Sequence, residues 1–177
     1  MPDAKDLAFI TVGPMSSGTR LLTKVLIAGG CTGDPGHEQR FDFAIPAPGS
    51  GPIVWRRSMP HGAVPKMPSI TTMFGELREA DWDPHVVVIY RDPTATERSA
   101  LERQGFVRDL ADARDWHQRS CTALASQLGQ IPTNRQTVVT YESLVLHPRE
   151  VQAALWDRLG LPGGIHILVT DQNRKRL

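Results

Sequence analysis

The sequence has few cysteines, few aromatic residues and almost no net charge. Its two cysteines, Cys31 and Cys121, stand far apart and outside any CxxC or Cys/His metal pattern. This spacing argues against a disulfide framework or a zinc site and suits a reducing compartment. With a formal net charge of +1, the chain has no overall attraction to nucleic acid or membranes. Any anion must therefore be bound by local groups of donors and cations.

Long hydrophobic runs are also missing. No segment approaches the length of a membrane span, and the first residues, MPDAKDLAFITVG, lack the layout of a signal peptide. We therefore expect a cytoplasmic protein with no membrane span. A chain of 177 residues with 40% hydrophobic content predicts one domain, over residues 1–177, with one sizeable core.

Apolar, β-rich runs alternate with segments of helical periodicity along the chain. Strands are predicted at residues 7–13, 53–57, 85–91 and 136–141. Helices are predicted directly after the first strand and at residues 69–80, 94–104, 109–129 and 148–159. Such alternation predicts an α/β fold, a three-layer sandwich with a parallel sheet between two layers of helices.

The segment from Gly13 to Gly18, GPMSSG, has the GxxxxG frame of a phosphate-binding loop. Because it lies between a predicted strand and a predicted helix, its backbone amides and the helix N-terminus would form a cradle for an anion. Ser17 and Thr19 would add hydroxyl donors. A glycine-rich turn with Ser17 as the helix N-cap explains the same residues, so the loop alone does not decide between the two.

The two residues after Gly18 are Thr19 and Arg20, where a nucleotide triphosphatase would have Lys and a Mg²⁺-binding hydroxyl. This difference disfavours a Mg-ATP site. A sulfuryl group carries less charge than a terminal phosphoryl group, so hydrogen-bond donors and a basic side chain are enough for its in-line transfer.

Three segments in order resemble the sulfotransferase family: SSGTRLL (16–22), VVVIYRDPTATERSA (86–100) and VVTYESLVLHPREVQAALWDRLGLP (138–162). The resemblance implies a P-loop NTPase-like fold and transfer of a sulfuryl group from 3'-phosphoadenosine 5'-phosphosulfate (PAPS), without a metal, to a hydroxyl or amine. It implies that the donor's 3'-phosphate is bound by Arg91 and Ser99. The resemblance also implies that the 5'-phosphosulfate is held by the loop residues Pro14, Ser16, Ser17, Gly18, Thr19 and Arg20.

The spacing of Arg91 and Ser99 has a physical rationale of its own. Ligands bind at the carboxyl ends of strands in open α/β sheets, and a serine in the next helix can face the same phosphate. The alternative is a surface arginine paired with Asp92 or Glu97, with Ser99 facing water.

The chain departs from the family pattern where a Lys or Arg usually precedes Ser-Gly-Thr, because it has Ser16 there. The missing charge could come from Arg20, Lys24 or the Arg56–Arg57 pair. A glycine-rich adenosine-binding stretch is not evident near the C-terminus, where residues 174–176 (RKR) are at best a weak substitute.

An attacking hydroxyl must lose its proton, so a base is expected within reach of the loop. Glu38, in GHEQRFD, is the first choice, because several sulfotransferases use a Glu at a comparable distance after the loop. His37 is the second choice and His61 the third, because imidazole titrates near neutrality. Together with Arg20, Glu38 and His37 form the predicted catalytic set. The histidines at positions 85, 117, 147 and 166 show no spacing that suggests catalysis.

Two other functions stay open at this point. A small P-loop kinase would need Mg²⁺ and a carboxylate at a strand end, for which Asp92 is available. A degenerate family member would bind nucleotide or a partner without turnover. Because acceptor pockets are built from variable loops, here residues 29–52 and 56–69, the acceptor could be a carbohydrate, lipid, small phenol or peptide.

Overall fold

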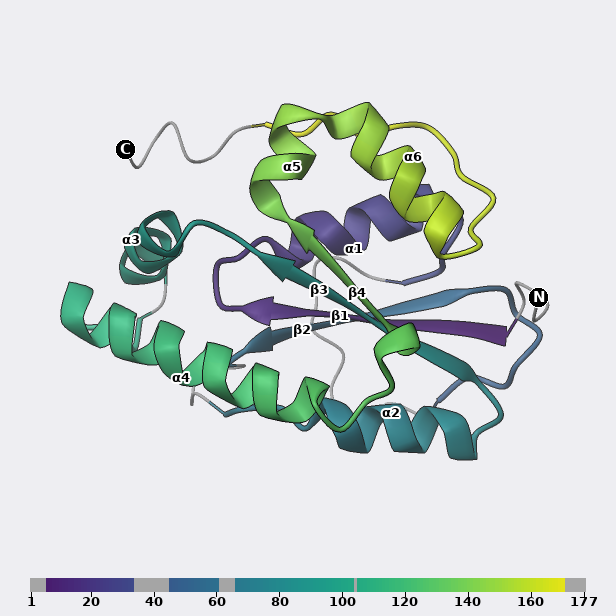
Figure 1. The fold of residues 1–177 in the computed structure, drawn as a ribbon, viewed down its shortest axis with the longest axis horizontal. Coiled ribbons are helices and arrows are strands. Elements are labelled where there is room, and N and C mark those ends of the chain that lie inside the picture. Colours follow the sequence, from purple (N-terminus) through teal and green to yellow (C-terminus); the bar gives the residue numbers. More distant parts are fainter. Residues whose placement is uncertain (1–5, 34–44, 61–65, 104, 171–177) are drawn as a thin grey trace.

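The computed structural model describes residues 6–33, 45–60, 66–103 and 105–170. Its centre is a four-stranded sheet in the order β2-β1-β3-β4, in which every neighbouring pair is parallel (Figure 1). The strands are β1 (Leu7–Pro14), β2 (Ile53–Met59), β3 (Asp83–Tyr90) and β4 (Gln136–Thr140). The predicted α/β class with a parallel sheet is confirmed, and each strand lies where an apolar run predicted it.

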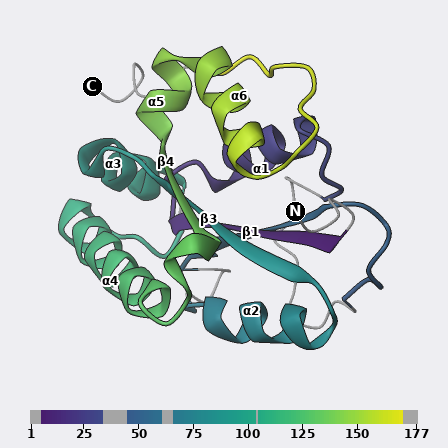
Figure 2. The same ribbon diagram turned by 45° about the vertical axis from the view of Figure 1, so that its right-hand side comes forward.

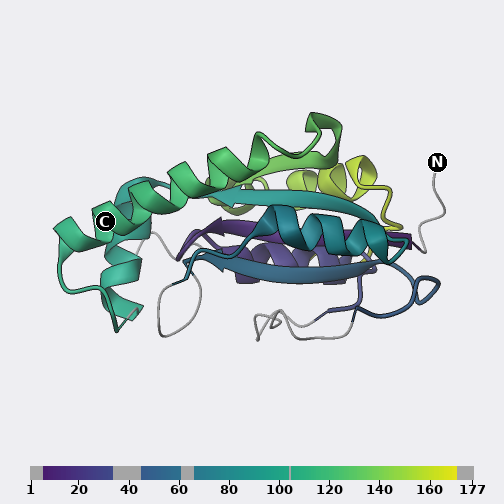
Figure 3. The ribbon, with the colours of Figure 1, turned by 90° about the horizontal axis from the view of Figure 1, so that it is seen from below.

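Helices cover both faces of the sheet, as the alternation of elements requires. One layer contains α1 (Thr19–Ala28), α5 (Tyr141–Leu146) and α6 (Pro148–Arg158), and the other contains α2 (Ile70–Glu79) and α4 (Leu110–Leu128). Figures 2 and 3 show these layers on opposite sides of the sheet. Helix α3 (Pro93–Arg103) lies beyond the carboxyl ends of the strands (Figure 1), and a short 3₁₀ turn, η2 (Thr133–Arg135), precedes β4.

Two apolar cores form because successive side chains of a strand point to opposite faces. Phe9 of β1 packs in the core beneath α1 and α6, together with Leu22 and Trp156. Its neighbour Ile10 packs in the core beneath α2 and α4. Each face of the central strands is therefore buried, which is why these strands are apolar at nearly every position.

The C-terminal end of the fourth predicted strand is shorter than expected. Thr140 ends β4, and its side-chain Oγ1 accepts a hydrogen bond of 3.1 Å from the backbone N–H of Ser143. This cap starts the short helix α5 at Tyr141, which the apolar pattern did not predict. In the part of the chain that the structure describes, no helix combines the length and apolar character needed to cross a bilayer.

The strand order places a topological switch point between β1 and β3. The chain leaves β1 for α1 on one face of the sheet and leaves β3 for α4 on the other, so the two connections diverge (Figure 2). Ligands in open α/β sheets bind at the carboxyl ends of such strands. The GPMSSG loop follows β1 and Arg91 follows β3, so the fold brings both to this edge.

Candidate active site

The loop after β1 is held in a defined path by backbone hydrogen bonds. Its path is held by two hydrogen bonds, from Met15 N to Met59 O at 2.8 Å and from Ser17 N to Pro14 O at 3.0 Å. Ser16 and Gly18 have positive φ angles of 63° and 108°. Gly18 also faces Tyr141, whose Cδ2 would lie only 3.0 Å from an added Cβ, so both the backbone angle and the space require glycine there.

Among the described residues, no side-chain hydrogen bond caps the N-terminus of α1, whose N-cap residue is Gly18. Ser17, which could have been the cap, is fully buried, and its Oγ has no hydrogen-bond partner among the described residues. Free amides at a helix N-terminus, a buried hydroxyl and the positive end of the helix dipole together favour an anion.

Arg91 ties the end of β3 to the loop. Arg91 is 8% exposed, and its guanidinium donates a hydrogen bond of 3.0 Å to the Ser16 carbonyl. It also lies over the ring of Tyr141, with Cζ 4.6 Å from the ring centroid. Asp92 caps α3, because its Oδ1 accepts a 2.8 Å hydrogen bond from Ala95 N. The loop after β1 and the end of β3 are therefore connected directly through an arginine.

The first turns of α3 bury two hydroxyls. Thr96 is 1% exposed and Ser99 is fully buried, and neither hydroxyl has a hydrogen-bond partner in the described part of the chain. Ser99 thus does not face water, and Glu97 lies near Arg114 of α4, with Oε2 3.6 Å from Nε. Buried hydroxyls are normally hydrogen-bonded, so these two would be satisfied by a polar ligand entering this edge.

The cations of β2 are buried, whereas those of α1 are exposed. Arg56 and Arg57 are 8% and 2% exposed, whereas Arg20 and Lys24 are exposed on α1. Burial and, secondarily, Arg56 lower the pKa of Arg57 to about 10, which keeps its guanidinium charged at neutral pH. The end of β2 reaches the first residue of α1, because Ser58 Oγ lies 3.3 Å from Thr19 Oγ1.

Residues 6–164 match the family model described as "Sulfotransferase family". The chain belongs to the sulfotransferase family. No curated protein matches the sequence.

Solved structures with the same fold include two sulfotransferase domains, one from an olefin synthase and one from the curacin biosynthetic pathway. The domain of the Synechococcus PCC 7002 olefin synthase is 17% identical, with a TM-score of 0.59, and the match covers 90% of this chain and 76% of that chain. The domain from the curacin biosynthetic pathway is 15% identical, with a TM-score of 0.55, and the match covers 86% and 74%. Mouse sulfotransferase SULT7A1, solved in complex with PAP, is 14% identical, with a TM-score of 0.56. That match covers 98% of this chain but only 63% of the mouse chain.

Several residues predicted for this sulfotransferase lie outside the described part of the chain. These are the candidate bases Glu38, His37 and His61 and the basic residues at 174–176. Their roles stay predictions. Among the described residues, the structure brings the loop, Arg91, α3 with Ser99 and the end of β2 to one edge of the sheet.

Sequence reasoning passed over one residue at this edge. His117 of α4 is half-buried, and its Nδ1 is a buried atom with no hydrogen-bond partner among the described residues. It shares this property with the hydroxyls of Ser16, Ser17, Thr96 and Ser99. The only sequence signal is position, because His117 follows the buried Ala113 by one helical turn.

Proposed function

We propose that this sulfotransferase moves a sulfuryl group from PAPS to a hydroxyl or amine of a small-molecule or carbohydrate acceptor. The observation that carries the proposal is the Arg91–Ser16 hydrogen bond of 3.0 Å, which joins the end of β3 to the loop after β1. The donor has two anionic groups at opposite ends of one nucleotide. A cradle of loop amides next to a buried arginine offers one site for each group.

The two ends of the donor would bind to different elements. The loop amides of residues 16–20, apart from that of Ser17, which donates to the Pro14 carbonyl, would hold the 5'-phosphosulfate together with the hydroxyls of Ser17 and Thr19. Arg91 and Ser99 would hold the 3'-phosphate, where the guanidinium fork and the buried hydroxyl would share one anion. The complex of mouse SULT7A1 with PAP supports this choice of donor, since PAP is what PAPS becomes when it has lost its sulfuryl group.

In the transfer step the acceptor oxygen or nitrogen attacks sulfur while the bond from sulfur to the phosphate oxygen breaks. The electron pair of that bond stays on the phosphate, so negative charge grows beside the loop. Preorganised amides in a site shielded from water stabilise such charge strongly. Arg56 and Arg57 add positive charge from β2, which offsets the absence of a basic residue at Ser16.

Calorimetry with adenosine 3',5'-bisphosphate (PAP) tests the proposal without knowledge of the acceptor. We expect micromolar binding, about −8 kcal/mol, that is unchanged by Mg²⁺ or by EDTA. Mg-ATP, titrated under the same conditions, should bind far more weakly. A preference for Mg-ATP would instead support a kinase, although Asp92, the carboxylate a kinase would need, already caps α3. PAP binding without any turnover of PAPS would identify a degenerate member.

Ser16→Lys is expected to raise the turnover of PAPS. The family usually has a cation at this position, and an ammonium there would stabilise the charge on the leaving phosphate by about 1–3 kcal/mol, or about 5- to 150-fold in kcat. The backbone already has a positive φ of 63° with a non-glycine residue, so the substitution adds little strain. Steady-state release of PAP measures the effect, and Ser16→Gln controls for side-chain size. Equal rates in both variants would contradict a role for the charge.

A further inference from the structure

Helix α4 carries a row of residues from the core of the sheet to the edge where the strands end. Leu124 packs in the core beneath α2 and α4, and Ala113 belongs to a small apolar cluster that also contains Met15 of the loop after β1. His117 lies between them, one turn after Ala113 and one turn before Cys121. Cys121 is close enough to Tyr90, the last residue of β3, to raise its pKa. His117 is therefore level with the strand ends.

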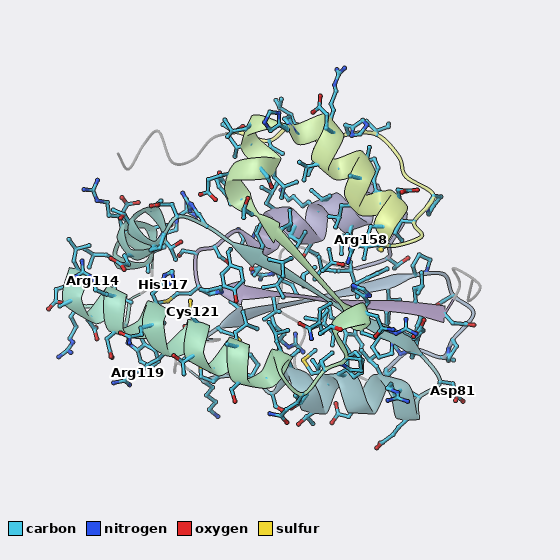
Figure 4. All side chains as sticks on the ribbon, viewed as in Figure 1. Asp81, Arg114, His117, Arg119, Cys121 and Arg158 are labelled. Atoms are coloured by element: carbon cyan, nitrogen blue, oxygen red, sulfur yellow. The ribbon has the colours of Figure 1, made fainter. Side chains whose placement is uncertain are left out.

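The directions in which the side chains of α4 point agree with this position of His117. Figure 4 shows His117 and Cys121 projecting toward the strand ends and α3, whereas Arg119 projects away from them. Met15, Ala100, Val107 and Ala113 form a small apolar cluster that joins the loop, α3 and α4 beside His117. His117 is thus one helical turn from the residue of α4 that belongs to this cluster, Ala113.

The charges around His117 belong mainly to acids. Burial lowers the pKa of its imidazole, and the carboxylates of Glu97 and Asp92 oppose that effect. Glu97 is in turn 3.6 Å from the guanidinium of Arg114, on α4. The other titratable groups nearby are the Cys121 thiol on α4 and the Tyr90 phenol on β3, and burial raises the pKa of both. Near neutral pH these two groups stay uncharged, and the imidazole is neutral.

We propose that His117 is the general base that removes the proton from the acceptor. This proposal rests on the proposed sulfuryl transfer. As the acceptor oxygen forms its bond to sulfur, its proton moves to a ring nitrogen of His117, and the electron pair of the broken S–O bond leaves with PAP. The imidazolium then returns the proton to water. The carboxylates of Glu97 and Asp92 stabilise the imidazolium while it exists, as an acid beside a catalytic histidine does.

The same surroundings argue against His117 as a ligand of the donor's phosphates. A phosphate ligand should be cationic, yet burial favours the neutral ring, and Glu97 and Asp92 would repel a phosphate placed beside it. A neutral ring with a buried nitrogen that has no partner in the described residues is suited to accept a proton. Its hydrogen bond would form only when the acceptor is bound.

The first test follows the His117 ring by NMR in the full chain and needs no acceptor. PAP bound at the loop and at Arg91 and Ser99 brings negative charge nearer to the ring without contacting it, so we expect the pKa of His117 to rise by about half a unit or more. The ring signals of the exposed His147 serve as the internal control and should not change when PAP is added. Binding of PAP with no change in the pKa of His117 would overturn the proposal and leave the donor site intact.

The second test is kinetic and uses His117→Gln, with His147→Gln as the matched control. Wild-type protein is given PAPS and a panel of alcohols, sugars and phenols, and PAP release is followed from pH 5 to 9. His117→Gln should lower kcat by about 10²- to 10⁴-fold, bind PAP as tightly as wild type, and lose the rise of kcat with pH that deprotonation of the ring produces. The loss should be smaller for 4-nitrophenol, which is already largely ionised, than for phenol.

Comparison with Glu38→Gln and His37→Gln separates this proposal from the predictions based on the sequence. If Glu38→Gln or His37→Gln removes the pH dependence while His117→Gln keeps it, His117 is not the base. An equal loss for both phenols in His117→Gln, or weaker PAP binding, would also reject the proposal. Failure of wild-type protein to bind PAP would reject the sulfuryl transfer itself.

Discussion

Arg91→Ala is expected to weaken the binding of PAP by about 100-fold or more, roughly 3 kcal/mol. The guanidinium is buried, and its charge-assisted hydrogen bonds to a phosphate would be lost in a place that water cannot fill well. The substitution also removes the 3.0 Å hydrogen bond to the Ser16 carbonyl and the contact with the Tyr141 ring. Both anion sites should therefore be weakened, which calorimetry with PAP measures.

Two further variants serve as controls for the effect of Arg91→Ala on PAP binding. Arg91→Lys keeps the charge but lacks the planar fork, so its affinity for PAP should lie between that of wild type and that of the alanine variant. Arg149→Ala removes an exposed arginine of α6 and should bind PAP as wild type does. If Arg91→Ala binds PAP normally while it keeps its thermal stability, Arg91 does not belong to the donor site.

Gly13→Ala is expected to lower the free energy of unfolding by about 1–3 kcal/mol. An added Cβ would lie 2.3 Å from the carbonyl oxygen of Ile89 and 2.4 Å from Ser17 Oγ. The first atom belongs to the backbone of β3, so β1 and β3 must move apart to make room. Movement of Ser17 would also disturb the loop, so PAP binding should weaken along with stability.

The matched control is Gly75→Ala, in the middle of α2. A Cβ there meets no atom within 4 Å, and alanine favours a helix over glycine by about 0.5–1 kcal/mol. Urea unfolding of the two variants should therefore give opposite changes in stability. Equal, small effects in both would contradict the close contact between Gly13 and β3.

The elements that follow hydrophobic periodicity were predictable. The strand at 85–91 is apolar because β3 is buried on both faces, and Leu22, Val25 and Leu26 are spaced to bury one side of α1. The helix α5 was not predictable in this way, because it is six residues long and depends on the cap made by Thr140. The apolar periodicity of a helix can be distinguished from a chance arrangement only over several helical turns.

The candidate site also has features that the sequence predicts and features that it does not. The loop and the Arg91 to Ser99 spacing were predictable, because each is a short motif with a known physical role. Interactions between distant segments were not predictable. Examples are the hydrogen bond from Arg91 to the Ser16 carbonyl and the apolar cluster that joins Met15 to Ala113. His117 is the main example, because nothing around it in the sequence distinguishes it from the other histidines.

The sequence by itself determined the α/β class, the order of the elements and a glycine-rich loop between the first strand and helix, because periodicity and turn chemistry act over short distances. The tertiary structure alone decided which face of α4 meets the loop, which cations are buried beside it and which polar atoms lack partners in the described residues. These features depend on strand order and helix packing, which join residues as far apart as Ser16 and Arg91.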